Sequence, residues 1–180
     1  THVKLSPKEP EKIEYIIANC AECEPYLTAD YRRMLENPEE LIGGMKIILQ
    51  IFDKAQGVFG IENTKPDCIE KLKELTKDEP RMEVLKLQTK YPQAGERQLI
   101  YATTGRAINS SMLPADAGCV VDNVATISAI YRAVAKGEVV DNTEYLLVAP
   151  KWLQNKLLDM KDVEINHAQS GERACISVNL

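Results

Sequence analysis

The stretch Tyr15–Arg32, YIIANCAECEPYLTADYR, predicts a buried strand, a polar turn and then a helix. Residues 15–18 form a short, partly β-branched apolar run, which is typical of a strand that helices cover on both faces. Asn19 ends this run, and the carboxylates of Glu22 and Glu24 follow in the turn. Ligands of open α/β sheets bind beyond the carboxyl ends of strands, so this turn is where we expect a binding site.

Two helices are expected after the turn. The first begins near Tyr31, and the side chain of Thr28 or Asp30 could cap it. The second spans about residues 37–55, because an Asn-Pro pair opens it and apolar residues recur at helical spacing. The pair Gly43-Gly44 inside this helix indicates close packing against the sheet, since phosphate binding would require a strand directly before it.

Further strands and helices alternate along the chain. We predict strands at 57–62 and 82–87, helices at 65–79, 96–104 and 125–136, and a loop with a short strand at 113–124. This alternation predicts an α/β fold with a mostly parallel sheet and helices on its faces, because parallel neighbours need crossover connections. We expect residues 1–12 to form a loop. After residue 138 the character changes, with a possible strand at 144–148, a helix at 152–158 and no clear period in 163–180.

Composition excludes several classes of protein. A chain of 180 residues can bury one sizeable core, and its formal net charge of -5 without clustered Lys and Arg argues against nucleic-acid binding. No apolar run approaches the roughly 18 to 20 residues of a membrane span, and no signal region opens the chain, so we expect a cytoplasmic location. The 5 cysteines are dispersed, which favours reduced thiols. Cys20 and Cys23 form a single C-x-x-C pair without a second one, so we expect no metal site and a thiol packed under the turn.

Three signatures in the chain resemble one family. They are THVKLSP at 1–7, ANCAECEPYLTADYR at 18–32, and KYPQAGERQLIYATTGR at 90–106 followed by LPADAGCVVDNVATISAIY at 113–131. In this order they resemble the C subunit of the Rnf electron-transport complex, which is similar to the NADH- and flavin-binding subunit of respiratory complex I. The resemblance covers about residues 1–136, so we expect an Rnf-C-like domain at 1–138 and an extension of unclear assignment at 139–180.

The resemblance implies a Rossmann-like, three-layer α/β domain that holds FMN and receives hydride from NADH. It implies that Lys4 contacts the flavin, and that Tyr91, Gly95 and Glu96 form a loop over the flavin and nicotinamide. The full set of cofactor-binding residues that it implies is Lys4, Asn19, Glu22, Glu24, Tyr91, Gly95, Glu96, Asn123 and Thr126. The residues themselves agree in part, because Asn123 before an apolar helix is a capping position, and the free N–H groups of a helix start suit an anion such as the flavin phosphate.

The resemblance further implies part of an NADH-dependent oxidoreductase that passes electrons from NADH through flavin to iron-sulfur centres. The chain has no C-x-x-C-x-x-C-x-x-x-C-P run, so we expect 4Fe-4S clusters only in segments outside this chain. Implied partners are the other subunits of a membrane-bound electron-transport complex, or a soluble reductase. The implied location is the cytoplasmic face of the cell membrane.

A second hypothesis stays open. The chain opens at the threonine of the family's glycine-rich loop, and Cys20 and Ala94 stand where relatives often have glycine. On this hypothesis the fragment is inactive and keeps the fold as a structural or docking module without flavin.

Overall fold

The computed structural model describes residues 2–24, 26–138, 145–150, 163–167 and 173–178. The chain divides into two compact units, Thr1–Glu138 and Val139–Leu180. Among the described residues, no helix is both long and apolar enough to cross a membrane.

The first unit is built on a four-stranded parallel sheet. Its strands are β1 (Tyr15–Cys20), β2 (Gln56–Glu62), β3 (Met82–Leu87) and β4 (Cys119–Asn123), in the order β3-β2-β1-β4. All three neighbouring pairs run parallel. The predicted parallel sheet is therefore confirmed, with β1 at its centre.

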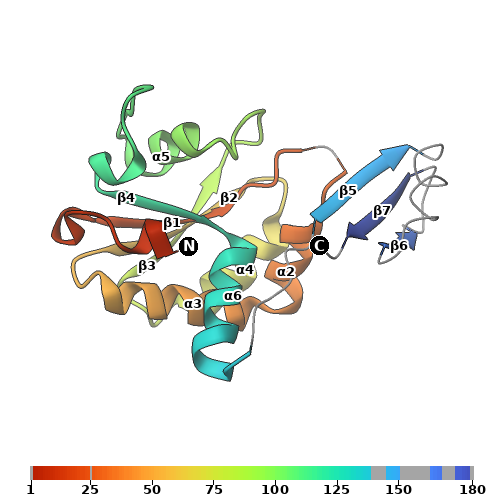
Figure 1. Cartoon of the computed structure of the whole chain (residues 1–180), viewed down its shortest axis with the longest axis horizontal. Coiled ribbons are helices and arrows are strands. Elements are labelled where there is room, and N and C mark those ends of the chain that lie inside the picture. The colour runs from red at the N-terminus through yellow and green to blue at the C-terminus, as the bar shows by residue number, and fades with distance from the viewer. Residues whose placement is uncertain (1, 25, 139–144, 151–162, 168–172, 179–180) are drawn as a thin grey trace. The chain divides into compact units, whose positions relative to one another are not determined.

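Helices cover both faces of this sheet. They are α2 (Ala29–Glu36), α3 (Pro38–Ile51), α4 (Pro66–Thr76), α5 (Glu96–Thr104) and α6 (Val124–Lys136). Figure 1 shows α5 on one side of the sheet and α3, α4 and α6 on the other. The three-layer α/β fold that the sequence predicted is thus confirmed.

Alternation along β1 explains why both faces are covered. Ile16 and Ala18 are fully buried in the hydrophobic cluster that contains the apolar residues of α3, α4 and α6. Ile17 between them is fully buried in a second cluster, with Leu99 and Ile100 of α5. Because successive strand residues point to opposite faces, an apolar run in β1 needs a helix on each side. Burial of each isoleucine contributes roughly 1.5 to 3 kcal/mol.

The glycine pair in α3 packs against a helix, and not against the sheet as predicted. A Cβ on Gly44 would lie 2.0 Å from the backbone oxygen of Ile127, and a Cβ on Gly43 would lie 2.2 Å from the ring of Tyr131. Both partners belong to α6. The predicted close packing is therefore between two helices, and not between α3 and the sheet.

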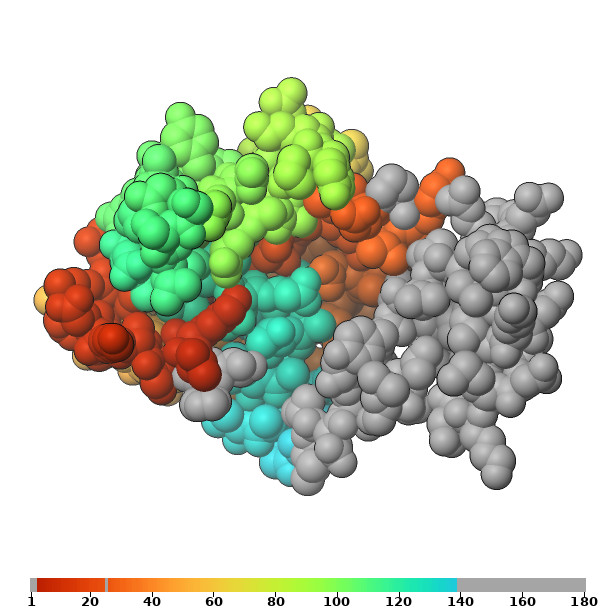
Figure 2. All heavy atoms as spheres, turned by 45° about the horizontal axis from the view of Figure 1, so that its top comes forward, coloured from red at the N-terminus to blue at the C-terminus, as the bar shows by residue number. Residues whose placement is uncertain are grey.

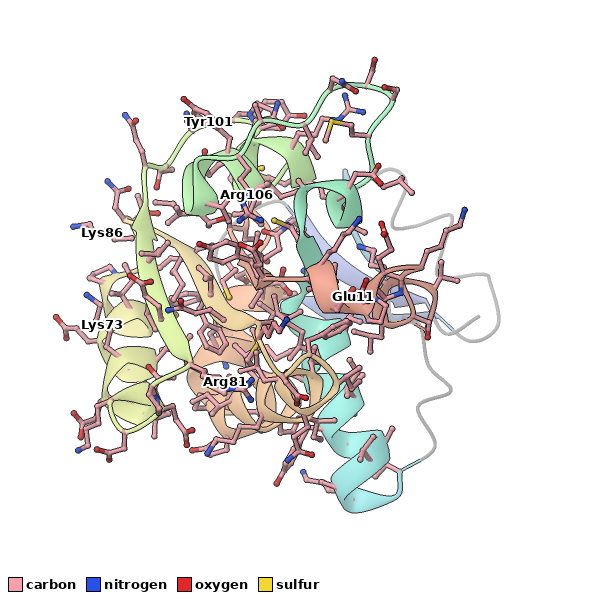
Figure 3. All side chains as sticks on the ribbon, turned by 90° about the vertical axis from the view of Figure 1, so that its left-hand side faces the viewer. Glu11, Lys73, Arg81, Lys86, Tyr101 and Arg106 are labelled. Carbon is pink, nitrogen blue, oxygen red and sulfur yellow. The ribbon has the colours of Figure 1, made fainter. Side chains whose placement is uncertain are left out.

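The end of α3 also differs from the expectation of about residue 55. The helix stops at Ile51, where the guanidinium of Arg81 donates hydrogen bonds to the carbonyls of Leu49, Phe52 and Asp53. Figure 3 shows Arg81 between the start of β3 and this end of α3. A charged donor thus satisfies carbonyls that have no partner within the helix, and this favours an earlier stop.

The N-terminal residues are more ordered than predicted. Instead of the expected loop, the structure has a short helix α1 (His2–Leu5) and a 3-10 turn η1 (Pro10–Lys12). Lys4 of α1 donates a hydrogen bond to the Val121 carbonyl of β4, 117 residues later. This long-range contact carries no local sequence signal, which explains why the prediction was wrong.

The second unit contains a three-stranded antiparallel sheet. Its strands are β5 (Tyr145–Pro150), β6 (Val163–His167) and β7 (Arg173–Val178), in the order β5-β7-β6. The strand predicted at 144–148 corresponds to β5. Two strands lie in 163–180, where the sequence showed no clear period, and the helix predicted at 152–158 lies outside the described residues.

Candidate functional site

The site lies where the strand order of the sheet reverses. β1 and β4 are neighbours, although the chain visits β2 and β3 between them. At their carboxyl ends Asn19 is in register with Asn123. The topology therefore brings two predicted site residues to one point, which is where open α/β sheets bind ligands.

Asn19 ties the end of β1 to the loop before α5. Its Nδ2 donates to the Ala94 carbonyl over 2.9 Å, and its Oδ1 accepts from the backbone nitrogen of Ala21. The loop held in this way carries Tyr91 and Gly95. Asn19 thus fixes the position of the predicted flavin loop at the edge of the sheet.

Lys4 and Glu96 come together at the end of β4. The Nζ atom of Lys4 lies 2.7 Å from the Val121 carbonyl oxygen, 3.3 Å from Glu96 Oε1 and 3.8 Å from Asp122 Oδ1. Figure 2 shows the N-terminal residues (red) beside the green segment that holds α5. Two predicted site residues from distant parts of the chain are therefore direct partners.

Asp122 is the buried member of this group. Only 6% of its side chain is exposed, and among the described residues its Oδ2 atom has no hydrogen-bond partner. Burial raises the pKa of the Asp122 carboxyl, the charge of Lys4 opposes this shift, and Glu96 adds to it. A polar group of a ligand would satisfy the free oxygen.

The start of α6 is a capped helix terminus. The Oδ1 atom of Asn123 accepts from the backbone nitrogen of Ala125 over 2.8 Å, so Asn123 caps the helix as predicted. Its Nδ2 donates to Asp30 Oδ2 over 2.7 Å. Thr126, the third residue of α6, is half-buried in the same first turn. The free N–H groups of a helix start attract a phosphate.

Glu22 has a structural role that the sequence did not indicate. Its two carboxylate oxygens accept from the backbone nitrogens of Asp30 and Tyr31, at 3.0 and 3.3 Å, and so cap α2. Thr28 occupies the N-cap position, but its side chain makes no capping hydrogen bond. The predicted capping by Thr28 or Asp30 is therefore wrong, because a carboxylate from the preceding turn supplies it.

The remaining predicted residues are arranged differently. Glu24 is exposed, and Tyr91 is 71% exposed. Gly95 is the N-cap residue of α5, where a Cβ would lie 2.6 Å from Gln98 Oε1 and 3.0 Å from the Pro92 carbonyl oxygen. A side chain at this position would therefore require Gln98 to move and would crowd the Pro92 carbonyl, whether or not a ligand approaches the loop.

Two residues that the sequence reasoning missed lie beside Glu22. The Nζ atom of Lys65 is 3.5 Å from a carboxylate oxygen of Glu22 and 3.7 Å from one of Glu62. All three side chains are largely buried, with 13% of Lys65, 6% of Glu22 and 2% of Glu62 exposed. Within the described part of the chain, Lys65 Nζ and Glu62 Oε1 lack hydrogen-bond partners. Glu62 ends β2, so the rule that pointed to the end of β1 would also have found it.

The cysteines form no metal centre in the described part of the chain. Cys20, Cys23, Cys68 and Cys119 are free thiols, and no group of three or more His, Cys, Asp or Glu residues is placed to hold an ion there. Cys20 is fully buried, and this burial raises the pKa of its thiol. The predicted packing of one thiol under the turn is confirmed.

Fold and site together define a parallel α/β domain with a capped helix start at the point where the strand order reverses. The chain belongs to the family of Nuo51 FMN-binding domains, whose model matches residues 1–132. The resemblance to this family that the sequence signatures indicated is thereby confirmed.

The relatives of known identity are oxidoreductase subunits. The chain is 48% identical over 136 residues to the C subunit of the proton-translocating ferredoxin:NAD(+) oxidoreductase complex of Clostridium ljungdahlii, covering 76% of this chain and 30% of that protein. It is 44% identical over 137 residues to the C subunit of the Na(+)-translocating ferredoxin:NAD(+) oxidoreductase complex of Acetobacterium woodii, covering 76% and 31%. The chain thus spans less than a third of the length of these relatives.

Solved structures support the fold alone. The NAD+-reducing [NiFe]-hydrogenase in its air-oxidized state matches 69% of this chain and 24% of its own, with a TM-score of 0.57 and 21% identity. The H2-reduced state matches with a TM-score of 0.58 at the same 21% identity, over 73% of this chain and 26% of its own.

Proposed function

We propose that this chain is the FMN- and NADH-binding domain of an Rnf-type C subunit, which passes electrons from NADH through flavin to iron-sulfur centres elsewhere. Membership of the FMN-binding family supports the flavin. The names of the relatives, which are C subunits of ferredoxin:NAD(+) oxidoreductase complexes, support a nicotinamide nucleotide as redox partner and the kind of complex. The observation that carries the proposal is the capped start of α6 beside Lys4, at the reversal of strand order.

The residues present fit the phosphate end of such a cofactor. Asn123 and Thr126 lie in or before the first turn of α6, where backbone N–H groups have no partner within the helix. Lys4 brings a positive charge to the neighbouring end of β4, and half of its side chain is exposed. The free oxygen of Asp122 is a hydrogen-bond acceptor, so it fits a donor group of a ligand and not its phosphate. In this proposal Lys4, Asn123 and Thr126 hold the phosphate side.

The nicotinamide side would be formed by the turn after β1 and the loop before α5. Asn19 holds that loop through Ala94, and exposed Tyr91 offers an aromatic face. The residues assigned to this side are Asn19, Glu22, Glu24, Tyr91, Gly95 and Glu96. When bound, the flavin takes up hydride from the nicotinamide and releases electrons to acceptors.

The proposal extends to partners and location. We place the chain with the other subunits of a membrane-bound electron-transport complex at the cytoplasmic face of the cell membrane, or with a soluble reductase. The names of the relatives support the first assignment, because both are subunits of ion-translocating complexes.

Bleaching of flavin absorbance tests this function. FMN is added to the purified chain, free flavin is removed, and NADH is added without oxygen. We expect loss of the absorbance band near 450 nm, and about a tenfold loss of FMN affinity in Thr126→Val, since a phosphate loses one hydroxyl donor. Thr89→Val, which alters an exposed threonine bonded to Asn63 and Thr64, is the matched control. Bound flavin that NADH leaves oxidised would contradict the NADH assignment.

A second candidate is a module that keeps the fold and binds no flavin. It is favoured by one observation, which is that the side chains of Asn19, Glu22 and Asn123 all make hydrogen bonds within the chain. A chain that binds neither FMN nor NADH would support this candidate.

A further inference from the structure

An acidic side chain engages the donor that a phosphate would use at the start of α6. The Oδ1 atom of the Asn123 amide accepts from Ala125. Its Nδ2 atom, which carries two hydrogens, donates one of them to Asp30 Oδ2 over 2.7 Å. Asp30 belongs to the first turn of α2, 93 residues earlier in the chain. A carboxylate of the chain therefore sits at the position where the proposed function places an anion.

The surroundings leave this carboxylate without a close counter-ion. Glu22 accepts from the Asp30 backbone nitrogen over 3.0 Å and adds a second negative charge. Lys65 lies 3.5 Å from Glu22, and Asp30 itself makes no ion pair within the described residues. Burial raises the pKa of the Asp30 carboxyl, and the negative charge of Glu22 raises this pKa further. The hydrogen bond from Asn123 lowers the pKa, and the positive charges of Arg33 and Lys65 lower it to a smaller extent. Ionisation of Asp30 therefore costs more free energy in the folded chain than it would in water.

We propose that Asp30 determines the selectivity of the site among flavins, because its carboxylate competes with the flavin phosphate for the Asn123 amide and the start of α6. This inference rests on the proposed function and deepens it. A phosphate monoester brings about -1.5 to -2 charges at neutral pH, and so meets repulsion from Asp30 that a flavin without phosphate does not meet. Affinity for FMN is therefore reduced, while affinity for riboflavin is unaffected.

Binding of two flavins by matched variants tests the inference. Asp30→Asn removes the charge and keeps an oxygen that accepts from Asn123. Glu36→Gln removes one charge at the other end of α2, where Glu36 pairs with Arg32. We expect Asp30→Asn to bind FMN about tenfold more tightly and riboflavin equally, and Glu36→Gln to change neither. Asp30→Ser is a second uncharged variant, and thermal unfolding verifies that each one is folded.

The outcomes separate this inference from the proposed function. FMN binding by the wild type without a gain in the folded Asp30 variants would overturn the inference alone. An equal gain for riboflavin and FMN would also overturn it, because competition with phosphate predicts no gain for riboflavin. Absence of FMN binding in every variant would overturn the proposed function and this inference with it.

Discussion

Lys4 Nζ lies 3.3 Å from Glu96 Oε1, although 92 residues separate them in the sequence. The same Nζ lies 3.8 Å from the buried Asp122. α1, α5 and β4 therefore meet at one cation, at the edge of the sheet where we propose that the cofactor binds. The charge balance of this edge depends on Lys4.

Lys4→Met should destabilise the chain in a pH-dependent way. Burial raises the pKa of Asp122 and Lys4 opposes the shift, so the variant raises this pKa further. When the pKa of a carboxyl is higher in the folded than in the unfolded state, the folded state becomes less stable as pH rises through the folded-state pKa. We expect a loss of about 1 kcal/mol at pH 7, because Lys4 is half-exposed, and a smaller loss at pH 4. Urea unfolding at both pH values measures it.

Asp122→Asn provides the control for this prediction. In that variant no buried carboxylate at position 122 requires a counter-ion, so Lys4→Met should lower the free energy of unfolding by much less. An equal cost in both backgrounds would contradict the proposed role of Lys4 as the counter-ion of Asp122.

Gly44→Ala should destabilise the chain by about 3 kcal/mol, because its Cβ would lie 2.0 Å from the Ile127 carbonyl oxygen. Gly43→Ala is the matched comparison, since its Cβ meets the side chain of Tyr131 and no backbone atom. We expect a smaller loss for Gly43→Ala, partly offset by the better helix propensity of alanine. Thermal unfolding gives both values. A stabilising effect of Gly44→Ala would show that α3 and α6 are packed less closely.

Glu22→Ala should cost about 2 kcal/mol of unfolding free energy, because α2 loses its cap and buried Lys65 loses an ion-pair partner. Glu24→Ala removes an equivalent carboxylate two residues later, from an exposed position, and should change stability by less than about 0.5 kcal/mol. Urea unfolding compares the two. Equal losses would contradict the capping role of Glu22.

Thiol modification at pH 8 should distinguish Cys23 from the buried cysteines. Cys20, Cys68 and Cys119 are fully buried, and burial raises the pKa of Cys68 to about 11. About a thousandth of the Cys68 thiol is then ionised at pH 8, whereas Cys23 is partly exposed. Peptide mapping after a short treatment with iodoacetamide should find Cys23 modified before Cys20, Cys68 and Cys119, and all five cysteines of the chain modified in urea. Equally fast modification of Cys20 would contradict the packing under the turn.

Elements with local signals were predictable from the sequence. The strand Met82–Leu87 and the helix Glu96–Thr104 match their predicted bounds, because apolar content, length and a terminal glycine define them locally. Gly105 takes the left-handed conformation, with φ of 73°, that a helix stop favours. The alternation of these elements was sufficient to predict the sheet and its two covered faces.

Features that depend on distant contacts were not predictable in this way. Strands β6 and β7 pair with one another and lack a clear period of their own. The capping of α2 by Glu22, and the hydrogen bond from Asn123 to Asp30, join residues that only the folded chain brings together. The sequence thus predicted that polar residues such as Asn19 and Asn123 gather at the carboxyl edge of the sheet, and not which of their polar groups have partners within the chain.

Equilibrium titration of FMN, followed by its fluorescence, tests the central claim most directly. The titration uses the 180-residue chain and the same chain preceded by a glycine-rich segment of the kind found in the family. We expect saturable binding that is tighter in the longer chain, because backbone N–H groups of such a segment add donors for the phosphate. Binding by neither chain, with both folded, would contradict the flavin site and favour a module without cofactor.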